Sequence, residues 1–306
     1  MGKLSKAFEK AEAANSTSFN EDSKLELKGG EDFGDSSGLT ARQRTAKEAE
    51  KTSKEQEDLL GDSKKRGSSS LFQRPIDPKI IVYHKPDSLA AEHFKVLRAS
   101  IFHPPEGREI KSILITSAME QEGKTMTVCN LAVSIAQSVN PYVLVIDADA
   151  RRPNVHNMLG MENRIGLTDY LESESNLSNF LQKSPIPKLT VLTAGSQVRN
   201  PAEIMTSEKM YSLLEETRQR YDDRFIIVDS PPAILAAETI TLSKYVDGVI
   251  LVVRYAVSTR EAVEEAVNRI GREKILGIVF NAFEVPPRRQ SYYRKYGSGY
   301  GYGYGT

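Results

Sequence analysis

The sequence has no tryptophan, one cysteine and no excess of either charge. With Cys129 alone, no intramolecular disulfide can form, which is typical of a reducing compartment. The 41 basic and 41 acidic residues balance, so composition gives no reason to expect a nucleic-acid partner. No apolar run approaches the ~20 residues that span a bilayer, and no secretory signal is visible. We therefore expect a cytoplasmic protein in which Cys129 is a buried packing residue.

Both ends of the chain are poor in large apolar side chains. Residues 1–75 are rich in Gly, Ser, Lys, Glu and Asp, and cannot bury enough surface to offset the entropy of ordering. We predict a disordered extension there, with a short amphipathic helix over Lys3–Ala14, where apolar residues recur at helical spacing. Residues 285–306 are rich in glycine and tyrosine and are predicted to form a flexible tail. The folded domain is therefore placed at residues 76–284.

The most informative stretch is Ser112–Thr127, SILITSAMEQEGKTMT. An apolar run, a polar loop and a helical pattern follow one another, which is typical of a phosphate-binding loop. Free backbone N–H groups at the start of the helix donate to the anion, and the helix dipole adds positive charge. The Lys124 ammonium can reach the β- and γ-phosphates, and the Thr125 hydroxyl can bind Mg²⁺. We predict nucleotide contacts from Glu122, Gly123, Lys124, Thr125 and Met126.

Two later apolar runs end in acids. Pro141–Asp147 is followed by Asp149, and Arg224–Asp229 is followed by Ser-Pro-Pro. Because ligands of open α/β sheets bind at the carboxyl ends of the strands, we expect the three acids beside the phosphate loop. Together with Thr125, Asp147, Asp149 and Asp229 are the predicted Mg²⁺ ligands. Either Asp147 or Asp149 would accept the proton of an attacking hydroxyl.

Strands and helices alternate along the rest of the domain. Further strands are predicted at Leu189–Thr193, Gly248–Val253 and Ile275–Phe280. A single helical stretch is predicted to open at Asn200 and to continue through Leu214, and another helix is predicted over Ser258–Ile270. This alternation predicts an α/β fold with a mostly parallel sheet and helices on both faces. With the phosphate loop, it indicates a P-loop NTPase.

Two further features allow more than one interpretation. The tail holds six tyrosines, and on its own is as consistent with a low-complexity adhesive segment as with a substrate. They are Tyr292, Tyr293, Tyr296, Tyr300, Tyr302 and Tyr304. A predicted helix after Ser88 carries Glu92, Lys95 and Arg98 three residues apart, a spacing that also suits a solvated charged face.

Taken together, the motifs and the tail resemble the bacterial tyrosine kinases of polysaccharide export, over about residues 76–306. TSAMEQEGKT resembles their Walker A motif, VLVIDADARRP their Walker A′ motif and FIIVDSPP their Walker B motif. The resemblance implies a protein tyrosine autokinase with ATP and Mg²⁺ as cofactors. It also implies catalytic roles for Lys124, Asp147, Asp149 and Asp229, and phosphorylation of the tail tyrosines in trans.

The same resemblance implies several partners. An E-x-x-R-x-x-R helix makes ring contacts between subunits in that family, and here it reads Glu92, Lys95 and Arg98. A transmembrane polysaccharide co-polymerase of the Wzz-like kind would recruit the kinase to the inner face of the plasma membrane. A tyrosine phosphatase would reset the tail. The start KLSKAFEKAE is similar to the exosortase-associated autokinase branch.

The phosphate loop departs from the family pattern P-G-E-G-K, because Glu120 and Gln121 replace Pro and Gly. A positive φ at Gln121 would cost of order 1 kcal/mol, and acids that face a phosphate oppose its binding.

One alternative function is a MinD/ParA-type ATPase switch. Such proteins carry a second lysine early in the loop, where this chain has Ala118 and Met119. The other is a nucleotide-binding scaffold without catalysis, which Gln121 favours.

Overall fold

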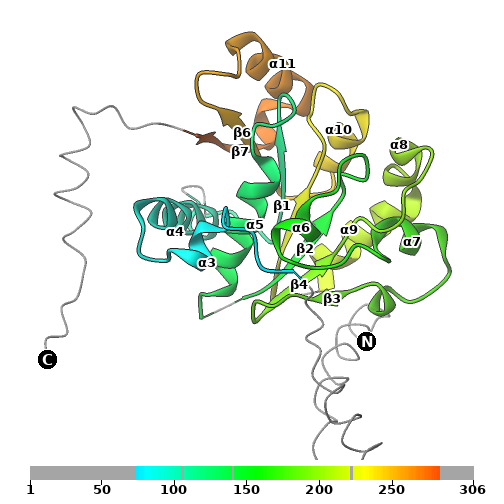
Figure 1. Cartoon of the computed structure of the whole chain (residues 1–306). Coiled ribbons are helices and arrows are strands. Elements are labelled where there is room, and N and C mark those ends of the chain that lie inside the picture. The colour runs from blue at the N-terminus through cyan, green and yellow to red at the C-terminus, as the bar shows by residue number, and fades with distance from the viewer. Residues whose placement is uncertain (1–73, 105–106, 140, 221–222, 283–306) are drawn as a thin grey trace, which may run out of the picture. The chain divides into compact units, whose positions relative to one another are not determined.

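A seven-stranded sheet forms the centre of the computed structural model, which describes residues 74–104, 107–139, 141–220 and 223–282 (Figure 1). The strand order is β3-β4-β2-β5-β1-β6-β7, and every neighbouring pair is parallel except β3 with β4. The strands are β1 (Ser112–Ser117), β2 (Tyr142–Asp147), β3 (Gln182–Lys183), β4 (Leu189–Leu192), β5 (Arg224–Asp229), β6 (Gly248–Arg254) and β7 (Ile275–Asn281). The predicted N-terminal helix and all six tail tyrosines lie outside the described residues.

Helices cover both faces of this sheet, as the sequence predicted (Figure 1). One face carries α3 (Ile81–His84), α4 (Leu89–Phe102), α5 (Lys124–Ala136) and α6 (Val155–Met158). The other carries α7 (Leu167–Glu172), α8 (Pro201–Met205), α9 (Glu208–Arg220), α10 (Ala237–Ser243) and α11 (Arg260–Ile270). Single 3₁₀ turns are found at Leu177–Asn179 and Arg272–Lys274.

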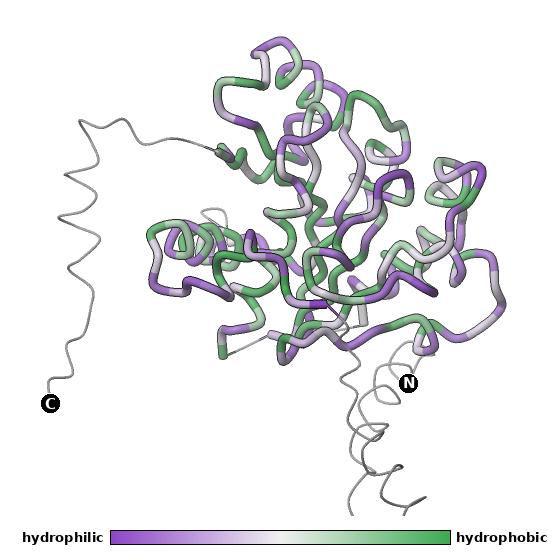
Figure 2. Tube along the Cα trace, in the orientation of Figure 1, coloured by the Kyte–Doolittle hydropathy of each residue, from purple (hydrophilic) through white to green (hydrophobic). Residues whose placement is uncertain are grey.

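Each central strand contributes to two hydrophobic cores because alternate side chains point to opposite faces. In β1, Ile113 and Ile115 pack under α3–α6, whereas Leu114 packs under α7–α11. All six β1 residues are buried, which explains why the sequence shows a continuous apolar run instead of alternation. Figure 2 shows apolar segments through the sheet and polar segments in many of the surrounding loops. Cys129 is fully buried in the first core, as predicted.

Local signals set the helix boundaries. The Ser88 hydroxyl accepts a hydrogen bond from the Ala91 N–H and caps α4, as the sequence predicted. The single helical stretch predicted after Asn200 is instead two helices, α8 and α9. The break has a physical reason, because the Ser207 hydroxyl accepts from the Met210 N–H and starts a new helix. The short helices α3, α6 and α10 and the short strand β3 were not predicted.

A buried amide joins α5 to the residues before α4. Asn130 is fully buried, and its Nδ2 donates to the Lys79 carbonyl at 2.9 Å. Its Oδ1 accepts from the Val82 N–H at 3.1 Å. Ile76, Ile80 and Val82 belong to the first core, so residues 76–82 are part of the folded unit.

No helix in the described ranges is both long and apolar enough to cross a membrane.

Asp247, just before β6, holds the start of β1. Its Oδ2 accepts from the N–H groups of Lys111 and Ser112 and from the Ser112 hydroxyl, at 2.9–3.0 Å. Its Oδ1 accepts from Arg218 at 3.2 Å. Burial favours the neutral acid, but the hydrogen bonds outweigh it and lower the pKa of Asp247.

We predict that Asp247→Asn lowers the free energy of unfolding by about 1–3 kcal/mol at neutral pH, because an amide cannot accept all four bonds. Since the pKa of Asp247 is depressed on folding, its contribution is present above the unfolded pKa of ~3.9 and is lost as pH falls through the folded value. Urea unfolding at several pH values measures this effect. Glu109→Gln, an exposed acid nearby, is the control and is expected to change stability little. An equal loss for both variants would contradict the prediction.

Candidate functional site

The loop between β1 and α5 lies at the carboxyl edge of the sheet, as predicted. Gly123 has a φ of 94° and precedes Lys124, the first residue of α5, so the free N–H groups of the helix start are exposed to this edge. Asp147 and Asp229 are the last residues of β2 and β5 and are direct partners in the parallel pairing. The fold therefore brings the loop and the strand-end acids together.

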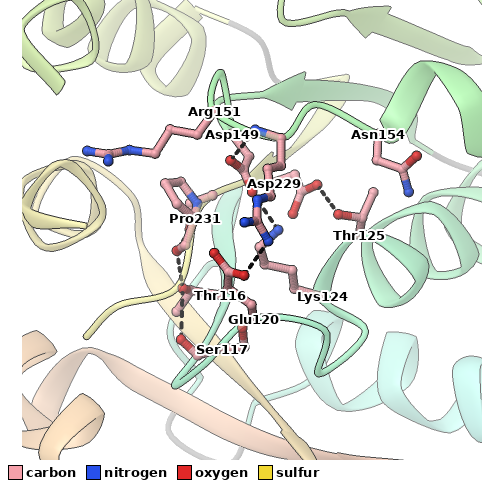
Figure 3. Close-up of polar contacts among 12 residues, drawn as sticks. Thr116, Ser117, Glu120, Lys124, Thr125, Asp149, Arg151, Asn154, Asp229 and Pro231 are labelled. Carbon is pink, nitrogen blue, oxygen red and sulfur yellow. Dashed lines mark hydrogen bonds and ion pairs between the residues drawn. The ribbon is translucent and has the colours of Figure 1, made fainter. Parts of the chain in front are cut away.

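Lys124 and Thr125 each contact one of the predicted acids (Figure 3). The Lys124 Nζ lies 2.6 Å from Asp149 Oδ2, and both side chains are largely buried. The Thr125 hydroxyl donates to Asp229 Oδ2 at 2.7 Å. Both contacts join residues more than 20 positions apart in the sequence.

Asp147 is used differently from Asp149. Its Oδ2 accepts from the N–H groups of Asn154 and Val155 at 3.2 Å, and its Oδ1 accepts from the Asp149 N–H at 3.3 Å. The fully buried carboxylate therefore shapes the loop after β2. Asp149 is the member of the pair that contacts the phosphate loop.

The electrostatics of the site reflect three acids around one ammonium. Burial opposes the charge of Lys124, but Asp229 and Asp149 outweigh it and raise its pKa. Burial and the Asp229 charge raise the pKa of Asp147 well above its usual value. Burial raises the pKa of Asp229 to about 6, although Lys124 and the Thr125 hydrogen bond favour its ionised form. Another cation at this place would favour the ionised acids.

One buried oxygen marks where such a cation fits. Asp229 Oδ1 has no hydrogen-bond partner, although the residue is fully buried. Three carboxylates and one ammonium give the cluster a formal charge of −2 when all are ionised, which suits a divalent ion. No group of three metal-ligating His, Cys, Asp or Glu side chains occurs among the described residues. This agrees with Mg²⁺ sites that use one or two carboxylates, with phosphates and water for the rest.

The structure explains how Glu120 and Gln121 are accommodated in the loop. Gln121 has a φ of 60°, so the position does adopt the left-handed conformation that glycine favours. Glu120 forms an ion pair with Arg152. Glu122, a predicted nucleotide contact, is buried, accepts from the Met119 N–H at 3.0 Å and bonds to the Ser258 hydroxyl. Its side chain supports the loop, so only its backbone is left to contact a phosphate.

Residues from the ends of β6 and β7 hold the loop from outside. Arg254 donates to the Gln121 carbonyl at 3.2 Å, and Asn281 Nδ2 donates to the Glu122 carbonyl at 2.8 Å. Asn281 packs so closely on Gly123 that a Cβ there would lie 2.0 Å from its Nδ2. Sequence reasoning missed these residues. The available signal was that Asn281, like Asp147 and Asp229, ends an apolar strand.

A cavity of about 410 Å³ opens beside the loop. Its polar lining includes Glu120, Gln121, Lys124, Asp149, Arg151 and Arg152, and its apolar lining comprises Pro231, Pro232, Leu235 and Ala236. Arg151 extends away from the other labelled side chains in Figure 3. Its Nε lies 2.8 Å from Oε1 of Glu238, an acid on α10 that is 1 % exposed. Sequence reasoning also missed Glu238, which nothing in the local pattern distinguishes from a surface acid.

The predicted oligomer contacts lie elsewhere, on α4. Lys95 forms an ion pair with Glu92 on the same helix, and Arg98 donates to the Ser134 carbonyl at the end of α5. Arg98 is therefore used within the chain. Their role between subunits stays a prediction.

Comparison with known proteins identifies clear relatives. Residues 111–275 match the family described as AAA domain. The tyrosine-protein kinase YwqD of Bacillus subtilis (strain 168) is 35% identical over 236 residues, which are 76% of this chain and 96% of YwqD. The putative tyrosine-protein kinase CapB of Staphylococcus aureus is 31% identical, over 71% of this chain and 95% of CapB. The solved kinase domain of the Escherichia coli tyrosine kinase ETK has a TM-score of 0.64 and 29% identity, and covers 70% of this chain and 84% of that one.

We predict that Gln121→Gly raises the free energy of unfolding by up to about 1 kcal/mol, because it relieves the left-handed conformation. The Gln121 contact to Arg254 uses the backbone carbonyl, which glycine keeps, so nucleotide affinity is expected to stay nearly the same. Urea unfolding and calorimetric titration with ATP measure the two quantities. Ala256→Gly is the matched control, since Ala256 has a φ of 57° and lies outside the loop. A change in Kd of about tenfold or more, 1.4 kcal/mol, would show that Gln121 weakens the site itself.

Proposed function

Since the chain belongs to the bacterial tyrosine-protein kinases, we propose that it transfers the γ-phosphoryl group of Mg-ATP to tyrosines in the tail of a second copy. The observation that carries this proposal is the convergence of Lys124, Thr125, Asp149 and Asp229 at the carboxyl edge of the sheet. This set contains one cation, Lys124, one hydroxyl and two acids, and we assign the further positive charge that the acids favour to Mg²⁺.

The residues have separate roles in this proposal. The N–H groups at the start of α5 and the Lys124 ammonium bind the β- and γ-phosphates. Thr125 and Asp229 hold Mg²⁺, and the unpartnered Asp229 Oδ1 supports this assignment. When bound, the ion offsets the negative charge of the phosphates. Asp147 maintains the loop after β2 through its bonds to backbone N–H groups.

Asp149 is the proposed proton acceptor. It lines the cavity beside Lys124 and contacts that ammonium at 2.6 Å. Once Lys124 turns to the phosphates, Asp149 Oδ2 is free to accept the proton of a tyrosine hydroxyl. Phosphoryl transfer needs little covalent chemistry from the protein, so positioning and charge account for most of the catalysis.

We propose the tail tyrosines, Tyr292 to Tyr304, as the acceptors of the phosphoryl group. Their phosphorylation would regulate capsule or exopolysaccharide synthesis. The tail is also basic and contains no acid. Assembly of copies through Glu92, Lys95 and Arg98 would bring a tail to a neighbouring site. A tyrosine phosphatase would remove the phosphates.

The proposed activator is a transmembrane polysaccharide co-polymerase that recruits the kinase to the inner face of the plasma membrane. The match covers 28% of the Escherichia coli tyrosine-protein kinase etk, whose kinase domain is solved by itself, and 96% of YwqD. The same kinase unit therefore occurs within a larger protein and nearly alone. The second arrangement supports a partner on a separate chain.

We predict that purified protein incubated with Mg-ATP gains phosphate on the tail tyrosines, and that Lys124→Ala abolishes it because the phosphates lose their ammonium. Phosphopeptide mass spectrometry measures the label, and phosphate release is measured in parallel. Lys183→Ala, at an exposed lysine outside both the phosphate loop and the proposed contacts between copies, is expected to retain the label and controls for the loss of a lysine. Release without label would favour an ATPase switch, and neither signal would favour a scaffold.

A further inference from the structure

We propose that the turn Pro231–Ala236 is the platform for the ring of the acceptor tyrosine, and that Leu235 makes the site prefer tyrosine over serine or threonine. The occupant is the tyrosine-rich tail of a second copy. This proposal rests on the proposed function and deepens it, because it names the surface that selects the acceptor.

The cavity beside the phosphate loop has two chemically different walls. Lys124 and Asp149 belong to the polar wall, where the phosphates and the proton acceptor are placed. Pro231, Pro232, Leu235 and Ala236 form the apolar wall. Phosphate and ribose gain nothing from such a surface, whereas an aromatic ring, of tyrosine or of adenine, gains by leaving water. We assign the apolar wall to the acceptor tyrosine because Asp149, the proposed proton acceptor, lines the same cavity, whereas adenine lies at the end of ATP away from the transferred phosphate.

The apolar wall is held rigidly against the sheet. The Pro231 carbonyl accepts from the hydroxyls of Thr116 at 2.7 Å and Thr239 at 2.9 Å. The Ala233 N–H donates to the Ser117 carbonyl at 2.8 Å. Figure 3 shows the contact between Thr116 and Pro231. A surface fixed in this way loses little entropy when a ring packs on it.

Leu235 is the exposed end of this wall. It is 52% exposed, although Pro232 and Ala236 on either side of it in the turn are buried. The carbonyl of Pro232 accepts from the N–H groups of Leu235 and Ala236, both at 3.1 Å, which fixes the direction of the turn. Leu235 therefore presents a large apolar side chain at the mouth of the cavity without contributing it to the core.

Arg151 adds a cation at the same cavity. Its ion pair with the buried Glu238 holds the guanidinium in place, while the Arg151 side chain remains 49% exposed. A guanidinium that borders an apolar wall can stack on an aromatic ring. Glu238 acts through Arg151 and is thus a positioning residue.

The geometry also explains why a short side chain would be a poor acceptor. A tyrosine hydroxyl lies at the far end of its ring, so a ring on the apolar wall can direct it at Asp149 in the same cavity. A serine hydroxyl lies next to its own backbone and leaves the wall uncovered. In the transfer itself, the phenol oxygen forms a bond to the γ-phosphorus, the bond to the β-γ bridging oxygen breaks, and Asp149 receives the phenol proton, leaving ADP and phosphotyrosine.

Steady-state kinetics with a peptide of residues 285–306 test the proposal. The enzyme carries serine at its six tail tyrosines, so that it is not its own substrate. We expect Leu235→Ser to raise the KM for the peptide about tenfold, the effect of 1.4 kcal/mol, and to leave the KM for ATP unchanged. Leu235→Met, which restores an apolar surface, should recover most of the peptide affinity. Ile165→Ser, at a residue 48% exposed outside the cavity, should have no effect.

An unchanged peptide KM in Leu235→Ser, or an equal rise in the KM for ATP, would overturn the proposal. Calorimetric binding of the same peptide, without catalysis, provides an independent measurement. Leu235→Ser should weaken this binding, and a peptide with serine in place of every tyrosine should bind wild-type protein poorly. Equal binding of both peptides would also overturn the proposal. If wild-type protein forms no phosphotyrosine, the proposed function fails, and the binding comparison still decides whether this surface recognises tyrosine.

Discussion

The site depends on keeping three buried carboxylates beside one ammonium. Parallel pairing of β2 with β5 makes Asp147 and Asp229 direct neighbours, and the loop after β2 adds Asp149. Removing charged groups from water is costly unless other groups compensate. Backbone N–H groups do so for Asp147, Lys124 for Asp149, and a threonine hydroxyl for one oxygen of Asp229. The second oxygen of Asp229 is left without a partner, so the same arrangement that favours binding a cation leaves the unliganded protein with uncompensated negative charge.

The position of the phosphate loop is set from more than one side. Strand β1 and helix α5 define where the loop begins and ends, while Arg254 and Asn281 fix its carbonyls from β6 and β7. Ser258 and the Met119 N–H bind the Glu122 carboxylate and turn it away from the place of the phosphates. Glu120 is paired with Arg152. Of the two acids in the loop, Glu120 is therefore neutralised by an arginine, and Glu122 is hydrogen-bonded by neutral groups that direct it away from the phosphates.

The sequence was sufficient to predict six of the seven strands, both helical layers and the central acids, because those strands are mostly apolar runs and each acid ends one or lies two residues beyond its end. The two-residue antiparallel strand β3 was not predicted. It could not predict the support of the loop. Arg254 and Ser258 reach residues 133 and 136 positions away, and such contacts leave no local pattern. Glu238 could not be distinguished from a surface acid until α10 placed it under Arg151. The division into α8 and α9 was missed because a single serine hydroxyl competes with the helical backbone, and the apolar spacing continues across the break.

Asn130 has a consequence for the order in which the chain folds. Its amide is satisfied by the backbone of residues 79 and 82, which are synthesised about 50 positions earlier. During synthesis, Ile76, Ile80 and Val82 therefore leave the ribosome well before the helix that covers them exists. These three side chains can be buried only after α5 has formed on β1. They are therefore made first in this core but become buried only when later segments have folded. Folding of this unit is consequently expected to be cooperative across its N-terminal half instead of progressing residue by residue.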